Sequence, residues 1–173
     1  MYVISGIYKG KKLKGFDIEG TRPTMSRVKE SLFATINPYI EDSEVLDLFA
    51  GSGALGIEAL SNKAKTCVFV DREEIPIRTL KENTKDIKGA IIVKKDYNKY
   101  LKETEDKFDI ILLDPPYHAN YINKSLNIIK EREILKENGI VVCEYEQEKF
   151  ISPYPLIKEK KYGHKTVSIY KNN

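Results

Sequence analysis

Short apolar runs alternate with stretches of helical periodicity through most of the chain. From Glu44 onward the apolar runs, which predict strands, are residues 45–49, 66–70, 90–93, 108–113 and 140–144. The stretches between them, which predict helices, are 54–62, 74–87, 96–103 and 120–136, with Gly89 and Gly139 as stop signals after the second and fourth. Runs such as 110–113 are apolar without alternation, which is typical of strands covered on both faces. The pattern therefore predicts a parallel sheet wrapped by helices.

The N-terminal part of the chain has a different pattern. Residues 2–7 and 11–18 flank a basic, glycine-containing turn at 8–10, which predicts a short β-hairpin. After a loop, Val28, Leu32 and Ile36 recur at a spacing of four and predict a helix over 25–36.

The C-terminal part predicts a second hairpin. Residues 157–162 and 166–170 are strand-like and flank Gly163, so we expect an antiparallel pair that closes the sheet. Together these patterns predict an α/β fold with its main body over 41–173. Residues 1–40 precede it as a basic hairpin and helix.

Composition narrows the class of protein only slightly. The chain has 173 residues, of which 41% are hydrophobic and 32% charged, which is ordinary for a globular domain. Cys67 and Cys143 lie in apolar runs, too few for a disulfide framework and without zinc spacing, so we expect buried thiols and no metal site. Neither a signal peptide nor a membrane-spanning run is present in the pattern, and we expect a cytoplasmic protein.

Charge is distributed unevenly along the chain. Residues 1–40 and 158–173 each carry a balance of +4, whereas residues 41–157 carry −5, within a net charge of +3. Two basic ends around an acidic body favour a surface that binds a polyanion. Solvated lysines without a partner fit the charge count equally well.

A glycine-rich turn between a strand and a helix is the first segment with chemical content. Glycines at 51, 53 and 56 follow the run 45–49 and permit a tight turn, a ligand close to the backbone, and close packing of the helix. This spacing suits a dinucleotide as well as S-adenosylmethionine. Asp47 favours the second ligand, because a carboxylate is welcome beside an ammonium group and unwelcome beside a pyrophosphate.

Two further carboxylates end predicted strands. Asp71 lies 20 residues after Gly51, where an acidic side chain holds the hydroxyls of a ribose. Asp96 follows the third strand and is a candidate for a hydrogen bond from an adenine amino group. Capping of the helix 96–103 explains Asp96 equally well.

The second chemical segment is Asp114-Pro115-Pro116-Tyr117, which follows the fourth strand. The prolines fix the backbone, so the Asp114 carboxylate and a proline carbonyl can both accept hydrogen bonds from one exocyclic amino group. Tyr117 supplies an aromatic face for a base lifted from its stack. Because ligands of open α/β sheets bind at the carboxyl ends of strands, we expect this segment and the glycine turn in one crevice.

These two segments resemble class I S-adenosylmethionine-dependent methyltransferases that act on exocyclic amino groups. Ile4-Ser5-Gly6, the segment 9–13 and the segment 22–33 narrow the resemblance to the RsmD family, which methylates guanine N2 in 16S ribosomal RNA. The resemblance implies a Rossmann-like seven-stranded sheet, S-adenosylmethionine as cofactor, and 16S RNA, free or in an assembling small subunit, as partner, with no obligate protein partner.

The resemblance also implies roles for individual residues. Cofactor contacts would come from Asp47, Ala50, Gly51, Ser52, Gly53, Asp71, Arg72, Asp96 and Tyr97. The catalytic segment would be Asp114, Pro115, Pro116 and Tyr117, and RNA contacts would come from Lys9, Lys11, Lys12, Arg22, Thr24 and Arg27.

Three other functions remain open on the sequence alone. A DNA adenine-N6 methyltransferase also suits Asp-Pro-Pro-Tyr, although the short chain lacks a separate target-recognition domain. An NAD-dependent oxidoreductase suits the glycine spacing but not Asp47. A catalytically silent binder in ribosome assembly is the third, against which the intact segment 114–117 argues.

Overall fold

A mixed seven-stranded sheet forms the centre of the molecule. The structure, a computed structural model, describes residues 1–15, 23–117 and 120–173. The strands are β1 (Glu44–Asp47), β2 (Thr66–Asp71), β3 (Ala90–Lys94), β4 (Phe108–Leu113), β5 (Leu135–Tyr145), β6 (Leu156–Tyr162) and β7 (Lys165–Lys171). The helices are α1 (Pro23–Ile36), the 3-10 helix η1 (Asn37–Tyr39), α2 (Ala54–Ser61), α3 (Glu74–Thr84), α4 (Tyr97–Glu103) and α5 (Tyr121–Glu131).

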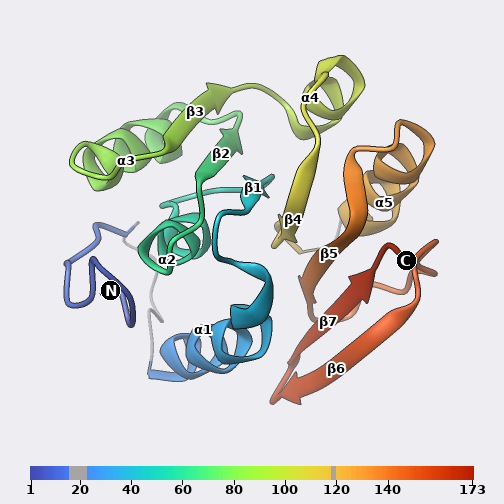
Figure 1. Ribbon diagram of the computed structural model, residues 1–173, viewed down its shortest axis with the longest axis horizontal. Helices are drawn as coiled ribbons and strands as arrows, with labels where there is room; N and C mark the ends of the chain where they lie inside the picture. Colours follow the sequence, from blue (N-terminus) through green and yellow to red (C-terminus); the bar gives the residue numbers. More distant parts are fainter. Residues whose placement is uncertain (16–22, 118–119) are drawn as a thin grey trace.

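The strand order is β3-β2-β1-β4-β5-β7-β6, which Figure 1 shows from β3 at the upper left to β6 at the lower right. The pairs from β3 to β5 are parallel, whereas β7 lies antiparallel between β5 and β6. The predicted parallel sheet with a closing antiparallel hairpin is confirmed. The order reverses between β1 and β4, which makes their carboxyl ends the expected ligand crevice.

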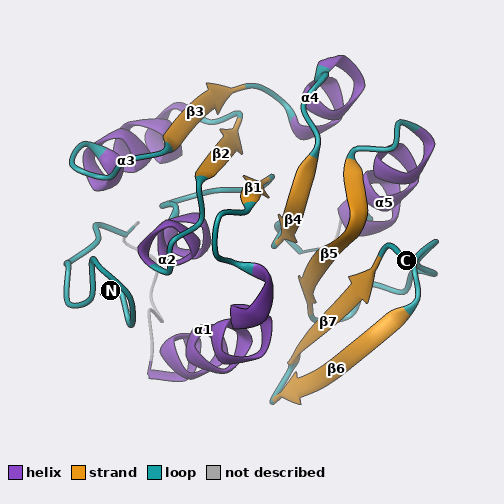
Figure 2. Cartoon of the chain, in the orientation of Figure 1, coloured by secondary structure: helices purple, strands orange, loops and turns teal. Residues whose placement is uncertain are grey.

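Helices cover both faces of the sheet, as Figure 2 shows by secondary structure. Side chains of α1, α2 and α3 pack with one face in a cluster that includes Leu32, Ile57 and Leu80. Side chains of α4 and α5 pack with the other face, for example Leu101 and Leu126. Both faces are therefore buried, which explains why the central strands are apolar without alternation.

The predicted N-terminal hairpin forms only in part. Its turn is present, but within residues 1–15 the two runs share a single antiparallel bridge, between Tyr2 and Lys12. Residues 16–18 of the predicted second run lie outside the described residues. The backbone N–H groups of Ile4 and Ser5 donate instead to the Glu58 carboxylate of α2, at 2.9 and 3.0 Å. The Glu58 side chain thus accepts hydrogen bonds from backbone N–H groups that would pair with the second run in a longer hairpin.

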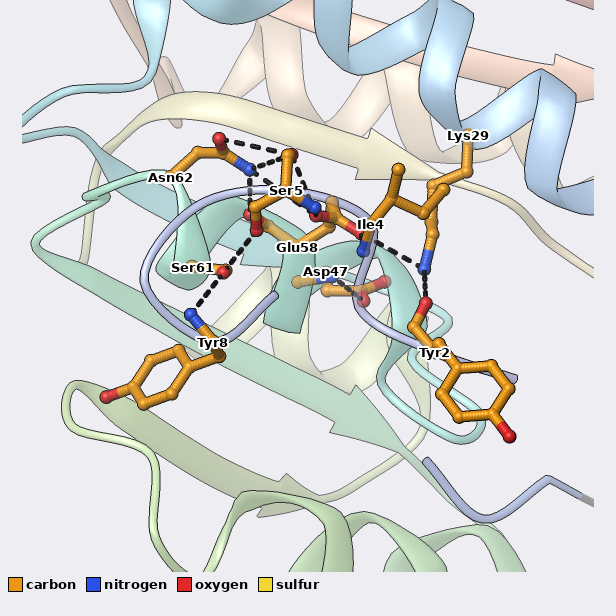
Figure 3. A network of polar contacts seen from close by, with 10 residues as sticks. Tyr2, Ile4, Ser5, Tyr8, Lys29, Asp47, Glu58, Ser61 and Asn62 are labelled. Carbon is orange, nitrogen blue, oxygen red and sulfur yellow. Dashed lines mark hydrogen bonds and ion pairs between the residues drawn. The ribbon is translucent and has the colours of Figure 1, made fainter. Parts of the chain in front are cut away.

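Glu58 is the centre of a buried polar network, which Figure 3 shows from close by. It is 1% exposed and forms an ion pair with Lys29 of α1 at 3.1 Å. The Lys29 ammonium also donates to the carbonyl of Tyr2 at 3.0 Å. One carboxylate therefore holds together the N-terminal segment, α1 and α2. Val3 and Leu13 of the N-terminal segment are buried in the same hydrophobic cluster as Leu32 of α1.

Two predicted helix ends are wrong. The helix expected over 120–136 ends at Glu131, because Glu133 adopts a left-handed conformation with φ 54° and the chain reverses. Strand β5 then begins at Leu135, which pairs with Phe108, so Gly139 lies within a strand and is not a helix stop. The helix expected over 74–87 ends at Thr84. In the described part of the chain, no helix has the length and apolar character needed to cross a bilayer.

Candidate functional site: a cleft at the carboxyl ends of the strands

A cleft of about 620 Å³ opens at the carboxyl ends of the central strands. Such a volume is typical of a small-molecule site. The predicted site residues that line it are Asp47, Ala50, Gly51, Ser52, Asp71, Arg72, Asp96, Tyr97, Asp114, Pro115, Pro116 and Tyr117. The structure therefore brings the glycine turn and the segment 114–117 together in one crevice.

The glycine turn has the backbone that its sequence predicts. Gly53 precedes α2 with φ 86°, in the left-handed region. A Cβ at this position would lie 2.4 Å from a methyl group of Leu80. A Cβ at Gly56 would lie 2.3 Å from the ring of Phe69, so only glycine lets α2 pack this closely on β2. Gly53 thus shapes the turn and, unlike Gly51, does not line the cleft.

Asp71 ties the end of β2 to the glycine turn. Its Oδ2 accepts a hydrogen bond from the backbone N–H of Gly51 and its Oδ1 from that of Glu73, both at 3.0 Å. Each carboxylate oxygen has two lone pairs, so both can accept a further bond from a neighbouring pair of hydroxyls. A ribose diol is a ligand of that kind.

Asp47 lies at the bottom of the cleft and is 2% exposed. Its Oδ2 accepts a hydrogen bond from the backbone N–H of Gly56 at 3.1 Å. Burial raises the pKa of Asp47 to about 7; the bond from Gly56 opposes this shift, and the charge of Asp71 adds to it. A ligand that brings an ammonium group would favour the ionised form.

Replacing Asp47 with Asn is expected to remove part of the pH dependence of stability. The pKa of Asp47 is about 7 when folded; when unfolded it is about 3.9. This carboxyl therefore stabilises the fold fully below about pH 4, and its contribution is lost as the pH rises to about 7. The stability of Asp47→Asn relative to wild type should rise by about 3 kcal/mol from pH 5 to pH 8. Urea denaturation of both proteins at pH 5 and pH 8 measures this change. The same difference in unfolding free energy between variant and wild type at both pH values would contradict a raised pKa for Asp47.

Asp96 caps α4. Its Oδ1 accepts hydrogen bonds from the backbone N–H groups of Asn98 and Lys99, at 2.9 and 3.3 Å. Of the two roles that the sequence left open, the structure shows the cap. Oδ1 is used for this purpose, so an amino group of a ligand would have to bind Oδ2.

An aromatic cluster that the sequence analysis missed forms another wall of the cleft. Phe49, Tyr97 and Tyr121 lie with ring centroids 5.0 to 5.7 Å apart. All three line the cleft. Flat apolar faces beside acceptor groups suit a purine ring.

Asp114 follows β4 and is half-buried at the cleft. Burial, and next the negative charge of Glu144, raise the pKa of Asp114 well above its usual value, whereas the charge of Lys165 acts against the shift. No hydrogen bond joins its carboxylate to the described residues. Tyr117 is 43% exposed and lines the cleft.

Glu144 and Lys165 are cleft residues that the sequence analysis also missed. Glu144 lies in β5, beside β4, and its Oε1 forms an ion pair with the ammonium of Lys165 at 2.6 Å. Burial lowers the pKa of Lys165, but the charges of Glu144 and then Asp114 outweigh it and raise this pKa overall. The sequence contains one signal for Glu144, since a glutamate follows the apolar run 140–143 at the end of a predicted strand.

Four of the predicted RNA-binding residues, Lys9, Lys11, Lys12 and Arg27, do not line the cleft. Lys9, Lys12 and Arg27 are exposed and Lys11 is half-buried. Arg22 and the side chain of Thr24 lie outside the described residues. Among the side chains that the structure describes, no group of three or more His, Cys, Asp or Glu could hold a metal ion.

The chain matches a family model described as "Conserved hypothetical protein 95" over residues 1–171. It is 38% identical to ribosomal RNA small subunit methyltransferase D of Haemophilus influenzae, over 98% of this chain and 93% of that protein. The solved structure of yhhF from Escherichia coli superposes with a TM-score of 0.91 at 29% identity, covering 100% of this chain and 98% of the other.

A more distant solved structure shares the fold alone. The 16S rRNA N2 methyltransferase RsmC of Thermus thermophilus, solved with AdoMet and guanosine, matches with a TM-score of 0.70 at 22% identity, over 91% of this chain and 45% of that one. The near-complete match to methyltransferase D and to the family model extends over both the cleft and the N-terminal segment. The chain belongs to the RsmD family of methyltransferases.

Proposed function

We propose that this enzyme transfers a methyl group from S-adenosylmethionine to the exocyclic N2 of a guanine in 16S ribosomal RNA. The observation that carries the proposal is the meeting of two segments, the glycine turn at 51–53 and the segment 114–117, in one cleft of an RsmD-family chain. One segment suits the cofactor and the other suits a planar amino group.

The cofactor half of the cleft is built from three carboxylates and the glycine turn. Asp47 suits the ammonium of the methionine part, Asp71 the ribose hydroxyls, and Asp96 the adenine amino group. Ala50, Gly51 and Ser52 bring the backbone close to the ligand, Gly53 shapes the turn, and Arg72 and Tyr97 flank the ligand. When bound, S-adenosylmethionine supplies a methyl group on a positively charged sulfur.

The acceptor half of the cleft orients the reacting nitrogen. The carboxylate of Asp114 and the carbonyl of Pro115 accept hydrogen bonds from the two N–H groups of guanine N2, and Tyr117 stacks on the base. These bonds raise the electron density on a conjugated nitrogen. As the N–C bond forms, the C–S bond breaks, the sulfur keeps the electron pair, and the extra proton on nitrogen passes to solvent.

Basic residues lie on both sides of α1. Lys9, Lys11 and Lys12 belong to the N-terminal segment, near α2 in Figure 1, whereas β6 follows the other side of α1. Lys158 and Lys160 of β6 donate hydrogen bonds to Thr35 and Ser31 of α1. We assign RNA backbone contacts to both groups, together with Arg27, Arg22 and Thr24, so residues 1–40 serve as an RNA-binding appendage to the catalytic domain 41–173.

Changing Lys11 and Lys12 together to Ala should flatten the salt dependence of RNA affinity. The slope of log K against log salt is negative, and each phosphate that a lysine no longer neutralises reduces its magnitude by about 1. The double variant should therefore have a slope that is shallower by about 2. Fluorescence anisotropy with a 16S fragment at several salt concentrations measures the slope. Lys99 and Lys102, exposed on α4 at the opposite face, provide the control pair. An equal slope for wild type and Lys11/Lys12→Ala would remove these lysines from the RNA surface.

The proposed reaction is tested with labelled S-adenosylmethionine and 16S RNA from a strain lacking this gene. The RNA is offered free and as assembled particles, then digested for nucleoside mass spectrometry. Labelled N2-methylguanosine establishes the reaction, and the better acceptor shows whether free RNA or the cytoplasmic assembling subunit is the partner. Label in N6-methyladenosine alone, or no label with S-adenosylhomocysteine bound, contradicts the proposal.

A further inference from the structure

Three charged side chains follow one another at the carboxyl edge of the sheet. Asp114 follows β4, Glu144 lies in β5 and Lys165 begins β7, and these strands are neighbours in the order β4-β5-β7. Leu113 pairs with Cys143, so the next residues, Asp114 and Glu144, lie side by side. All three line the cleft. Its edge therefore presents two carboxylates and then an ammonium.

Most of the hydrogen-bonding capacity of this row is unused. The Lys165 ammonium donates to Oε1 of Glu144 at 2.6 Å, which leaves two of its three N–H groups. Within the described part of the chain, Oε2 of Glu144 and both oxygens of Asp114 accept no hydrogen bond. Glu144 is only 6% exposed, but its Oε2 is not one of the fully buried polar atoms without a partner among the described residues, and the residue lines the cleft. A ligand bound in the cleft can therefore supply donors to this oxygen.

The four RNA bases differ in what their Watson–Crick edges offer to such a row. Guanine presents two donors and an acceptor in sequence, namely the N2 amino group, N1–H and O6. Adenine presents a donor and then the N1 acceptor, cytosine a donor and then two acceptors, and uracil a donor between two acceptors. Only guanine complements acceptor, acceptor and donor in that order.

We infer that Glu144 and Lys165 select guanine as the base to be methylated. Oε2 of Glu144 accepts from N1–H, and Lys165 donates to O6 while keeping its bond to Oε1. Asp114 accepts from N2, the reacting nitrogen. This inference rests on the proposed function and deepens it, since Asp114 serves the reaction whereas Glu144 and Lys165 determine which base is accepted.

The inference is tested with one base changed in the RNA. Once mass spectrometry of ribonuclease fragments has located the methylated nucleotide, a ligated 16S fragment carries either guanine or 2,6-diaminopurine there. The analogue keeps the N2 amino group but has an acceptor at N1 and a donor at position 6. Wild type should prefer guanine by about 100-fold or more in kcat/KM, because two contacts of about 10-fold or more each are mismatched.

Glu144→Gln is the matching variant. Its amide can donate to the N1 acceptor of the analogue and still accept from Lys165, so the preference for guanine should fall by about 10-fold. Glu44→Gln is the control, because Glu44 is the first residue of β1 and pairs with Lys136 at the amino ends of the strands, away from the cleft. S-adenosylhomocysteine affinity and the thermal midpoint of each variant show that the fold and the cofactor half are intact.

Two results overturn the inference while leaving the proposed function in place. One is equal methylation of guanine and 2,6-diaminopurine by wild type, which needs no variant. The other is an unchanged preference in folded Glu144→Gln. If wild type binds S-adenosylhomocysteine but methylates neither base, the proposed function fails and the inference fails with it.

Discussion

Asp114→Asn is expected to lower kcat by about 100- to 1000-fold, the usual effect of removing one preorganised polar group from a reacting centre. The asparagine has the same shape but no charge, so it accepts a hydrogen bond from N2 more weakly and raises the electron density on the nitrogen less. Affinity for S-adenosylhomocysteine should stay within a few-fold, because the carboxylates that we assign to the cofactor, Asp47, Asp71 and Asp96, are other residues. Single-turnover methylation of 16S RNA and calorimetric titration measure the two quantities.

The pH profile gives an independent readout for Asp114. Burial and the nearby Glu144 raise the pKa of Asp114 well above its usual value. The ionised, accepting form is therefore lost as the pH falls through this raised pKa, and wild-type kcat should decline on the acid side well above pH 4. Asp114→Asn should lack this limb. Wild-type kcat in the variant, or an identical acid limb, would exclude Asp114 from the reaction.

Removing Glu58 is expected to cost about 3–5 kcal/mol in the free energy of unfolding, because Lys29 would remain buried without its counter-charge. Glu58→Ala also leaves the N–H groups of Ile4 and Ser5 without their acceptor. The N-terminal segment should then detach from α2 and become a site of proteolysis. Urea denaturation measures the loss of stability, and limited trypsin digestion measures the release of the segment.

An exposed ion pair serves as the control for Glu58. Lys14 and Glu82 pair at the surface with side chains 72% and 55% exposed, so Glu82→Ala should cost less than about 1 kcal/mol. Lys29→Met with Glu58→Gln should recover part of the lost stability, since neither charge then lies unpaired. A loss for Glu58→Ala no larger than that for Glu82→Ala would show that the network does not hold the segment.

The sequence predicted the sheet and two segments of the site because both depend on local patterns. Apolar runs such as 108–113 specify strands, and the spacing of Gly51, Gly53 and Gly56 specifies the turn. Parallel strands then bring the turn and Asp114 to one edge without further information.

The rest depends on pairings between distant strands. Glu144 and Lys165 reach Asp114 only through the register of β4, β5 and β7, which no local pattern records. Glu58 likewise reads as one residue of an amphipathic helix, and only the folded structure shows that it takes the donors of the N-terminal run. The predicted hairpin was therefore too long for a reason that lies outside its own sequence.

Strand β6 has a consequence for self-association. It is the last strand of the sheet and, among the strands that the structure describes, it pairs only with β7. The exposed apolar side chains of Leu156 and Ile157 lie at its start. An unpaired edge of that kind invites pairing with a second copy, which natural sheets prevent with lysines. Lys158, Lys160 and Lys161 follow immediately. Lys158 and Lys160, to which we assign RNA contacts, thus also oppose pairing of this edge with a second copy, and neutralising them should lower solubility together with RNA affinity.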